Sequence, residues 1–508
     1  MCRGILRLLC PILELTEVLV RTLQRLRRTN DAMANRCQLI GLAVWLSTAQ
    51  VALSSAFAIN ELGARAQGMG GAFTSIADDA SAIFFNPAGI AFQKGLQLEM
   101  DELTVIGLFR FFPSDPPAGT AVPANGYSGS VKPHFIPVAN MYMTKDLNPK
   151  WSVGFGAFTP FGLSANFTNF KDADPTNTKF VGRFAGTRAR LESIWIQPTA
   201  SYRLSENSSL GLGVAVVHTH LLLEQSILNP YDEGRTFGLA LAPLVFPGLD
   251  PDLAAHSIAR FLPEGRSRVA GTSNSPGFSV GYLYKHSASK TNVGLMFRSA
   301  VTHHLKGRAS FAFTDTGAIK PFLPSPDTIS KLFPNQEIRG TFTTPANYVV
   351  GVSNSAFWNS TIAFDFQIQD FDRFSSIPLN FSQTQDTATP AERRLFFNFG
   401  NSYQLHAGIE KRLKKIRAVR AGYIFDHTPV PDRSVGPLFP DSSRHSFTVG
   451  ASQRLGNAEI TLFYQAMKML DRKTNVPTND NQFTNGEYRN FAHLAGFSMR
   501  LHFGRDVK

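Results

Sequence analysis

The stretch Ile76-Ala77-Asp78-Asp79-Ala80-Ser81-Ala82-Ile83-Phe84-Phe85-Asn86-Pro87-Ala88-Gly89 has neither helical nor strand periodicity. Two adjacent phenylalanines are followed directly by Asn86-Pro87, a dipeptide that favours a turn. The stretch lies just after a predicted signal-peptide cleavage site and precedes about 400 residues of strand-like sequence. We therefore predict a compact segment that buries its aromatic side chains and lies ahead of an all-β domain.

Residues 1–58 are predicted to be a leader that does not belong to the folded protein. Arg36 precedes an apolar stretch, residues 39–53, and this stretch ends at the small-residue site Ala56-Phe57-Ala58. That pattern is typical of a secretory signal with cleavage near Ala58. A signal peptide does not explain the arginine-rich segment before Met33. Either translation begins at Met33, or the natural leader is long.

The composition of the mature chain excludes several classes of function. All three cysteines (Cys2, Cys10 and Cys37) lie in the leader, so neither disulfides nor thiolate metal sites are expected. Removing the leader's seven Lys and Arg and three Asp and Glu lowers the formal charge from +12 to +8. No basic stripe stands out, so we expect no nucleic-acid partner. No mature segment approaches the roughly 20 apolar residues of a membrane-spanning helix, so a β-barrel, a periplasmic protein and a secreted protein remain.

Strand alternation decides among these three classes. In residues 210–216, 362–369 and 403–410, large apolar side chains alternate with small or polar ones. The polar face includes Asp365, His406 and Glu410, which do not suit the dry interior of a sandwich but suit the lumen of a transmembrane barrel. About fourteen such runs lie between residues 96 and 503. We therefore predict an all-β, antiparallel transmembrane β-barrel of about 14 strands, followed by a C-terminal extension, residues 504–508.

Several short strings occur in the order seen in one family of membrane proteins. They are Ala58-Ile59-Asn60-Glu61-Leu62-Gly63, Gly68-Met69-Gly70-Gly71-Ala72, Asp78-Asp79, Asn86-Pro87-Ala88 and, late in the chain, Phe425-Asp426-His427-Thr428-Pro429-Val430-Pro431. With the strand pattern between them, these strings resemble the FadL-like family of outer-membrane transporters for long-chain fatty acids and hydrocarbons. The resemblance implies a multi-pass protein of the outer membrane of a Gram-negative bacterium.

The same resemblance implies that residues 59–95 fold inward as an N-terminal hatch. A barrel of about fourteen strands has a wide lumen that must either conduct or be plugged. The residues expected to shape the hatch are Asn60, Glu61, Gly63, Gly70, Asp78, Asp79, Phe84, Phe85, Asn86, Pro87 and Ala88. The alternative is that Asp78, Asp79 and Asn86 only cap and turn a surface loop.

Two long, apolar extracellular loops are expected at about residues 225–276 and 312–337. Long loops without regular structure are uncommon unless they are functional. In the family, two such loops form an external hydrophobic groove, so the resemblance implies a capture site. Its candidate residues are Leu244, Phe246, Leu249, Ile258, Phe261, Phe322, Leu323, Leu332 and Phe333. The alternative is that these side chains only pack together to close the barrel.

In the family, the substrate leaves sideways at a kinked third strand, which corresponds here to residues 151–167. Its candidate gate residues are Pro160, Phe161 and Gly162. Proline lacks a ladder donor and glycine weakens local strand pairing. No carboxylate-binding residue can be assigned from the sequence. Arg420, Arg500 and His406 share the parity of the lumen and are interpreted as lining a wet wall.

We therefore predict outer-membrane transport of hydrophobic compounds, with long-chain fatty acids as the first candidate and neutral hydrocarbons or aromatics as the alternative. The expected partners are these small molecules, outer-membrane lipid and the barrel-assembly machinery. No cofactor is expected, since no catalytic motif is present and the pairs His218/His220 and His303/His304 have no neighbouring ligand cluster. An outer-membrane enzyme and a structural or adhesive barrel are the alternatives from other classes.

Overall fold

The computed structural model describes residues 56–114, 129–130, 136–167, 181–227, 248, 250, 265–313, 325, 327–384, 391–414, 416–476 and 484–503. The chain divides into two units, Met1–Ala49 and Gln50–Lys508, and all of the described residues belong to the second. The predicted leader up to residue 55 and the extension 504–508 therefore lie outside the described residues. Within the described part, no helix is long and apolar enough to cross a membrane.

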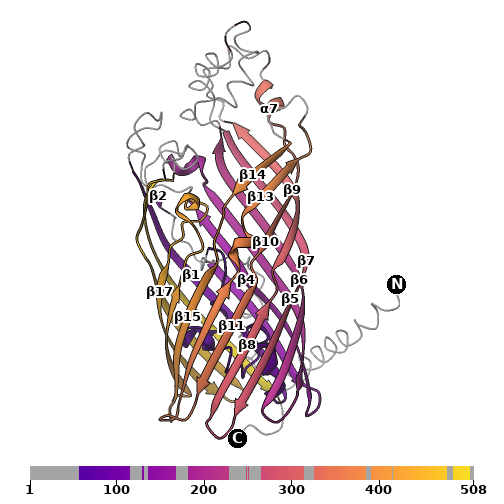
Figure 1. The fold of residues 1–508 in the computed structure, drawn as a ribbon, viewed down its shortest axis with the longest axis vertical. Coiled ribbons are helices and arrows are strands. Elements are labelled where there is room, and N and C mark those ends of the chain that lie inside the picture. Colours follow the sequence, from indigo (N-terminus) through magenta and orange to yellow (C-terminus); the bar gives the residue numbers. More distant parts are fainter. Residues whose placement is uncertain are drawn as a thin grey trace, which may run out of the picture. The chain divides into compact units, whose positions relative to one another are not determined.

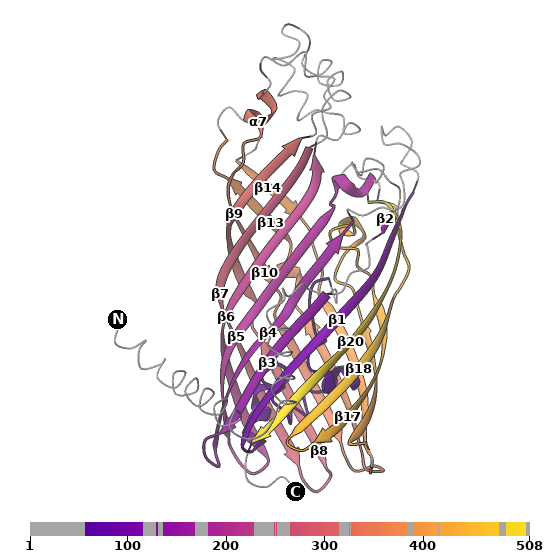
Figure 2. The same ribbon diagram turned by 180° about the vertical axis from the view of Figure 1, so that it is seen from behind.

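The described residues form one antiparallel sheet that closes into a barrel (Figures 1 and 2). The first strands are β1 (Leu96–Pro113), β2 (Gly129–Ser130), β3 (Ile136–Asp146), β4 (Trp151–Asn166), β5 (Arg188–Arg203), β6 (Ser208–Ile227), β7 (Gly265–His286), β8 (Thr291–Arg298), β9 (Val301–Phe313) and β10 (Gln336–Thr344). The remaining strands are β11 (Asn347–Asn354), β12 (Ser360–Gln369), β13 (Ser376–Phe381), β14 (Glu392–Phe396), β15 (Ser402–Arg412), β16 (Ala418–Asp426), β17 (Arg444–Leu455), β18 (Ala458–Met469), β19 (Arg472–Thr474) and β20 (Gly486–Phe503).

The number of labelled segments exceeds the number of strands in the barrel wall, because some wall strands are interrupted and carry two labels. Six pairs of consecutive segments (β2 and β3, β8 and β9, β10 and β11, β12 and β13, β14 and β15, β18 and β19) each pair with the same neighbours and form one wall strand. The barrel therefore has 14 strands, as the sequence predicted. It is closed by β1 and β20, which pair from Leu96 with Phe503 to Pro113 with Gly486. Closure removes the exposed sheet edges that a membrane does not tolerate.

The predicted alternation of strand faces is confirmed. In β6, Leu212 and Val216 are 52% and 57% exposed on the outer surface, whereas Gly213 and Ala215 are buried. In β12, Phe364 faces outward and Asp365 is buried. Successive side chains of a strand point to opposite faces, so the apolar row faces lipid and the small or polar row faces the lumen.

The first long loop ends earlier than its predicted range of about residues 225–276. β6 continues to Ile227 and β7 begins at Gly265, so part of the predicted loop range is strand. The sequence of the first half of β7 is rich in Ser, Thr, Gly and Arg, and an alternation without large apolar residues gives no strand signal. The second loop is closer to its predicted bounds, since β9 ends at Phe313 and β10 begins at Gln336, with α7 (Thr328–Leu332) between them.

The N-terminal segment before β1 lies inside the barrel. It contains α3 (Ala64–Gly68), α4 (Ala82–Phe85) and the 3-10 helix η1 (Pro87–Phe92), and its apolar side chains are almost all buried. In Figures 1 and 2 this indigo segment occupies the end of the barrel where the strands are joined by short turns. The outward-facing end carries the longer connections, among them η2 (Val181–Phe184), η4 (Phe371–Arg373) and η5 (Asp432–Ser434).

Candidate functional site

The Asn-Pro-Ala turn is an internal feature of the hatch. The side chain of Asn86 is fully buried, and its Oδ1 accepts a hydrogen bond from the Ala88 backbone N–H at 3.1 Å. Its Nδ2 donates to the carbonyls of Thr74 in the hatch, at 2.9 Å, and Tyr282 in β7, at 3.0 Å. One side chain thus caps η1 and joins the hatch to the wall. The alternative of a surface loop is wrong for this turn.

Wall glycines allow the hatch backbone to lie directly against the strands. A Cβ added at Gly211 in β6 would lie 2.3 Å from the Ala88 nitrogen, and one at Gly281 in β7 would lie 2.1 Å from Asn86 Oδ1. A Cβ at Gly408 in β15 would lie 2.2 Å from the Met69 carbonyl oxygen. The inward row of small residues therefore forms a seat for the hatch.

The hatch glycines Gly63 and Gly70 adopt backbone conformations that other residues rarely reach, with φ of +71° and +65°. These values fit the tight turns that the sequence predicted. Gly63 also donates its N–H to Asp101 Oδ2 in β1 at 3.2 Å. The other predicted hatch residues take part in the same packing: Asn60 Nδ2 donates to Gln404 at 3.0 Å, and Glu61 accepts the Asn60 N–H at 3.1 Å.

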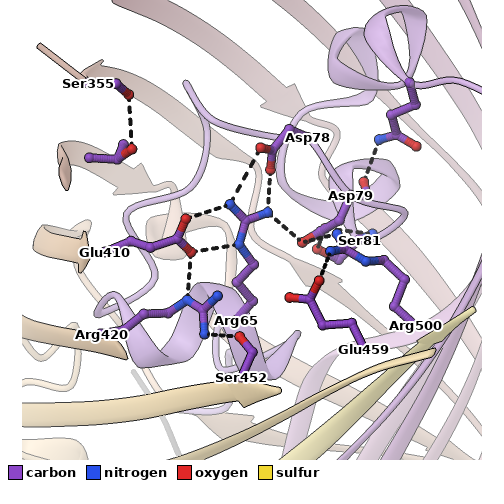
Figure 3. A network of polar contacts seen from close by, with 12 residues as sticks. Arg65, Asp78, Asp79, Ser81, Ser355, Glu410, Arg420, Ser452, Glu459 and Arg500 are labelled. Atoms are coloured by element: carbon purple, nitrogen blue, oxygen red, sulfur yellow. Dashed lines mark hydrogen bonds and ion pairs between the residues drawn. The ribbon is translucent and has the colours of Figure 1, made fainter. Parts of the chain in front are cut away.

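An ionic network anchors the hatch to the far wall of the barrel (Figure 3). Arg65 in α3 donates through Nε and Nη2 to the carboxylate of Glu410 in β15, at 2.9 and 3.1 Å. The same guanidinium pairs with Asp78 and Asp79 of the hatch. Burial raises the pKa of the Asp78 carboxyl, but Arg65 more than offsets this and holds its pKa below the usual value. Asp78 is therefore ionised and paired at neutral pH.

Two wall arginines complete this network. Arg420 in β16 donates to Glu410 at 2.7 Å and to Ser452, and Arg500 in β20 lies 3.8 Å from Asp79. His406 Nδ1 lies 2.7 Å from the Gly70 carbonyl oxygen. All three residues therefore contact the hatch or its anchor, a role that their interpretation as lining of a wet wall does not include, and Arg420 and Arg500 also line a polar cavity.

A polar cavity of about 220 Å³ lies next to this network. Its lining includes Arg65, Glu410 and Arg500, together with Arg412, Arg417, Arg454 and Glu459 at or near the short turns between strands. The cavity therefore lies at the short-turn end of the barrel, and its lining is mostly charged. We refer to this charged layer, made by Arg65, Asp78, Asp79, Glu410, Arg420, Glu459 and Arg500, as the hatch floor.

An aromatic cluster lies in a separate apolar core of the lumen. The fully buried ring of Phe57 is its centre, with the centroids of Phe374 and Phe371 at 4.8 and 5.2 Å. Phe399 and Phe439 lie at 6.5 and 6.3 Å, and the gate residue Phe161 lies at 6.0 Å. Ala56, Phe57 and Ala58 are thus part of the packed interior, although the predicted domain boundary assigns them to the leader.

The described ladder between β3 and β4 ends partway along β4. It runs from Asp146 paired with Ser152 to Met141 paired with Ala157, and beyond Ala157 the described wall pairing of β4 is with β5 alone. The ladder with β5 is itself shifted between Phe158 and Phe161. These are the positions where the sequence placed Pro160, Phe161 and Gly162.

The hatch N-terminus covers the freed edge of β4. Ile59 donates its N–H to the Pro160 carbonyl at 2.7 Å, and Gly162 donates to the Phe57 carbonyl at 2.6 Å. Ala58 forms an isolated bridge with Phe161. Residues 57–59 thus act as a short substitute strand where β3 does not pair, and they join the break in the wall to the aromatic cluster.

Most of the predicted capture residues lie outside the described residues, namely Leu244, Phe246, Leu249, Ile258, Phe261, Phe322 and Leu323. Leu332 ends α7 and is half-buried. Phe333 is buried, with its ring centroid 5.6 Å from Phe311 and 5.2 Å from Phe313 at the end of β9. For Phe333, this contact agrees with the packing alternative; the role of the other residues stays a prediction.

Sequence reasoning missed several residues that hold the hatch. Asp365 Oδ2 in β12 accepts the N–H groups of Phe73 and Thr74 at 3.0 and 2.8 Å. The sequence did indicate that Asp365, like Glu410, lies on the lumen-facing side of an alternating strand. Nothing in the local sequence of Arg65 indicates its partner. In the described part of the chain, no group of three His, Cys, Asp or Glu residues could hold a metal ion.

Comparison with known proteins identifies the family to which this arrangement of hatch and barrel belongs. The family described as "Outer membrane protein transport protein (OMPP1/FadL/TodX)" matches residues 45–503. The chain belongs to this family. A similar FadL-family relative is the long-chain fatty acid transport protein of Escherichia coli strain K12, which is 22% identical over 84% of this chain and 88% of its own length.

Solved FadL-family structures have the same fold. A Pseudomonas aeruginosa FadL homologue superimposes with a TM-score of 0.67 at 18% identity, covering 88% of this chain and all of its own. The Pseudomonas putida toluene transporter TodX gives a TM-score of 0.63 at 17% identity, covering 89% of this chain and all of its own. This FadL-family protein is an outer-membrane transporter of hydrophobic compounds in a Gram-negative bacterium, and it is not an enzyme.

Proposed function

We propose that the protein imports long-chain fatty acids, which it captures at its apolar extracellular loops and releases sideways through the break between β3 and β4. A rearrangement of the hatch N-terminus links the two steps. The observation that carries this proposal is the end of the β3–β4 ladder at Ala157, directly beside the aromatic cluster. Hydrophobic small molecules and outer-membrane lipid are the partners in this route.

The hatch floor supports lateral release over release straight into the periplasm. Its central ion pair is buried, since the side chains of Glu410 and Arg420 are 4% and 1% exposed. An alkyl chain that crossed this layer would separate charges without replacing their partners, which is costly. Transfer of the same chain between apolar surroundings keeps about 0.8 kcal/mol of favourable burial for each CH₂ group. The membrane next to the break provides such surroundings.

Neutral hydrocarbons or aromatic compounds are the alternative substrates. The E. coli relative is named as a long-chain fatty acid transport protein, and the P. putida relative in fold is named as a toluene transporter. The aromatic cluster itself has no charged member, so it suits either class. Uptake of labelled oleate and labelled toluene, in cells that lack the protein and in complemented cells, separates the two. A structural or adhesive barrel would restore neither.

A cross-link across the break tests the lateral route. All three cysteines lie within residues 1–58, so engineered thiols in the barrel would have no native competitor in the mature chain. Asn140→Cys with Thr159→Cys places one thiol on each side of the break, where Asn140 Oδ1 now accepts the Thr159 N–H at 3.1 Å. A short bifunctional thiol reagent should abolish oleate uptake, and a cleavable version should restore it on reduction.

The matched control is Met143→Cys with Phe155→Cys, because these residues are already partners in the ladder. The same reagent should leave uptake through this variant unchanged. Full uptake through the cross-linked Asn140–Thr159 pair would reject lateral release at this break.

A further inference from the structure

Arg298, the last residue of β8, is a buried cation without a counter-ion among the described residues. It is 2% exposed and forms no ion pair with any described carboxylate. Three other buried arginines, Arg65, Arg420 and Arg444, each contact at least one carboxylate. Burial of an unpaired charge is unfavourable. The carboxylate partners of the other three arginines explain their burial, whereas the burial of Arg298 needs a different explanation.

The hatch supplies the only oxygen that the Arg298 guanidinium contacts in the described structure. Nη2 donates to the carbonyl of Phe84 in α4 at 2.6 Å, whereas Nε has no hydrogen-bond partner. The guanidinium carbon lies 4.2 Å from the centroid of the Phe84 ring, 5.6 Å from Trp195 and 5.8 Å from Phe158. A neutral carbonyl thus occupies the place where a buried guanidinium would bind an anion.

Two further donors in the same group lack an acceptor. Trp195 Nε1 and Tyr142 Oη are buried, and neither has a hydrogen-bond partner among the described residues. Phe158 links them, with its ring stacked 6.2 Å from Trp195 and 5.9 Å from Tyr142. Arg298, Trp195 and Tyr142 therefore each have a buried N–H or O–H group without a hydrogen-bond partner among the described residues. An ionised carboxylate provides two acceptor oxygens and matches the fork of a guanidinium.

This donor group lies at the break in the wall. Phe158 is the residue at which the register between β4 and β5 begins to shift, and it follows Ala157, the last described partner of β3. Phe84 of the hatch covers the group from the lumen with both its ring and its carbonyl.

We propose that Arg298, with Trp195 and Tyr142, binds the carboxylate of the substrate, and that the Phe84 carbonyl is the stand-in for it while the hatch is closed. This deepens the proposed function, on which it rests, by naming an acid as the substrate class. Movement of α4 breaks the contact between Phe84 and Arg298, and a bound carboxylate takes the place of the Phe84 carbonyl. Each event therefore favours the other.

The test compares oleate with methyl oleate, which has the same chain but no charge. Equilibrium binding of both is measured on the purified, assembled barrel at pH 8 for the wild type, Arg298→Gln and Arg298→Lys. Arg394→Gln is the control, because this exposed arginine in β14 pairs only with Glu392 among the described residues. A charge-assisted hydrogen bond implies that Arg298→Gln lowers the oleate-to-ester affinity ratio roughly tenfold or more. Methyl oleate affinity should stay constant, and Arg298→Lys should keep most of the ratio.

Equal affinity of the wild type for acid and ester would overturn the proposal, as would an Arg298→Gln variant that keeps the wild-type ratio or weakens both ligands alike. If Arg298→Gln does not assemble, as judged by heat-modifiable migration, Trp195→Phe and Tyr142→Phe carry the test. Tyr142→Phe keeps its ring and loses the O–H donor, whereas Trp195→Phe replaces the indole by a smaller ring and loses the N–H donor. Each should lower the ratio without changing ester binding; an unchanged ratio in both rejects the site. Cells that take up neither ligand would instead reject the proposed function itself.

Discussion

Replacement of Glu410 by Gln should release the hatch from the barrel wall. The Glu410 carboxylate accepts hydrogen bonds from Arg65 at 2.9 and 3.1 Å and from Arg420 at 2.7 Å, and its side chain is 4% exposed. Glu410→Gln keeps the shape but leaves two buried guanidinium groups facing a neutral amide. Loss of one partner of a buried ion pair costs about 3–5 kcal/mol.

This cost should appear as a shift of the hatch equilibrium, since the β15 ladder is unaffected. At about 1.4 kcal/mol for each factor of ten, the closed hatch would lose roughly 100- to 4,000-fold of its advantage over open arrangements. Arg65 keeps Asp78 and Asp79 as partners, which favours the lower end of that range.

The assay is single-channel conductance in planar bilayers, supported by swelling of protein-containing liposomes in small sugars. Glu392→Gln is the matched control, because the Glu392–Arg394 pair is exposed, with side chains 43% and 44% exposed, and such pairs contribute about 0–1 kcal/mol. Glu410→Gln should conduct far more often than the wild type, and Glu392→Gln should not. Wild-type conductance from a correctly assembled Glu410→Gln barrel would show that this network does not hold the hatch.

Two other substitutions and one measurement test the rest of the arrangement. Gly211→Leu should unseat the Asn-Pro-Ala turn and raise conductance, because a Cβ at that position lies 2.3 Å from the Ala88 nitrogen; Gly400→Ala, whose Cβ meets only the Pro429 carbonyl oxygen at 4.0 Å, should behave as the wild type. Asp365→Ala should leave the N–H groups of Phe73 and Thr74 without their acceptor, at about 1–3 kcal/mol each, and should make the hatch more sensitive to proteolysis in detergent than the control Asp370→Ala. Intact-mass measurement of the mature protein should show that Phe57 is retained, because its ring is the centre of the aromatic cluster; a chain that begins at Ile59 would contradict this.

The barrel and its orientation of faces were predictable because they follow from local alternation. Leu212 and Gly213 differ in size and polarity at adjacent positions, and this difference alone decides which side chain faces lipid. Where alternation lacks large apolar residues, as at the start of β7, the same reasoning placed a strand in a loop. The residues of the hatch turn were recognised from their order in the chain, and the glycines of the hatch occupy the turns that their backbone freedom suggested.

The anchors of the hatch were not predictable, since they join residues that lie far apart in the sequence. Arg65 and Glu410 are separated by 345 positions, and Asp365 binds Thr74 across 291. The alternation of each strand shows that Glu410, Asp365 and Arg420 face the lumen. It does not show whether these side chains contact water or the hatch.

The amino-acid sequence by itself therefore determined the barrel, its inner and outer faces and the presence of an inward-folding N-terminal segment. The barrel and its faces follow from the size and polarity of neighbouring residues, whereas the inward-folding segment was implied by the resemblance to the FadL-like family. Only the tertiary structure decided how charge is placed inside the lumen: a paired network at the hatch floor and, beside the break in the wall, the guanidinium of Arg298, which has no carboxylate partner among the described residues. The energy of a buried charge depends on its partners. Those partners lie far apart in the sequence and come together only when the barrel closes.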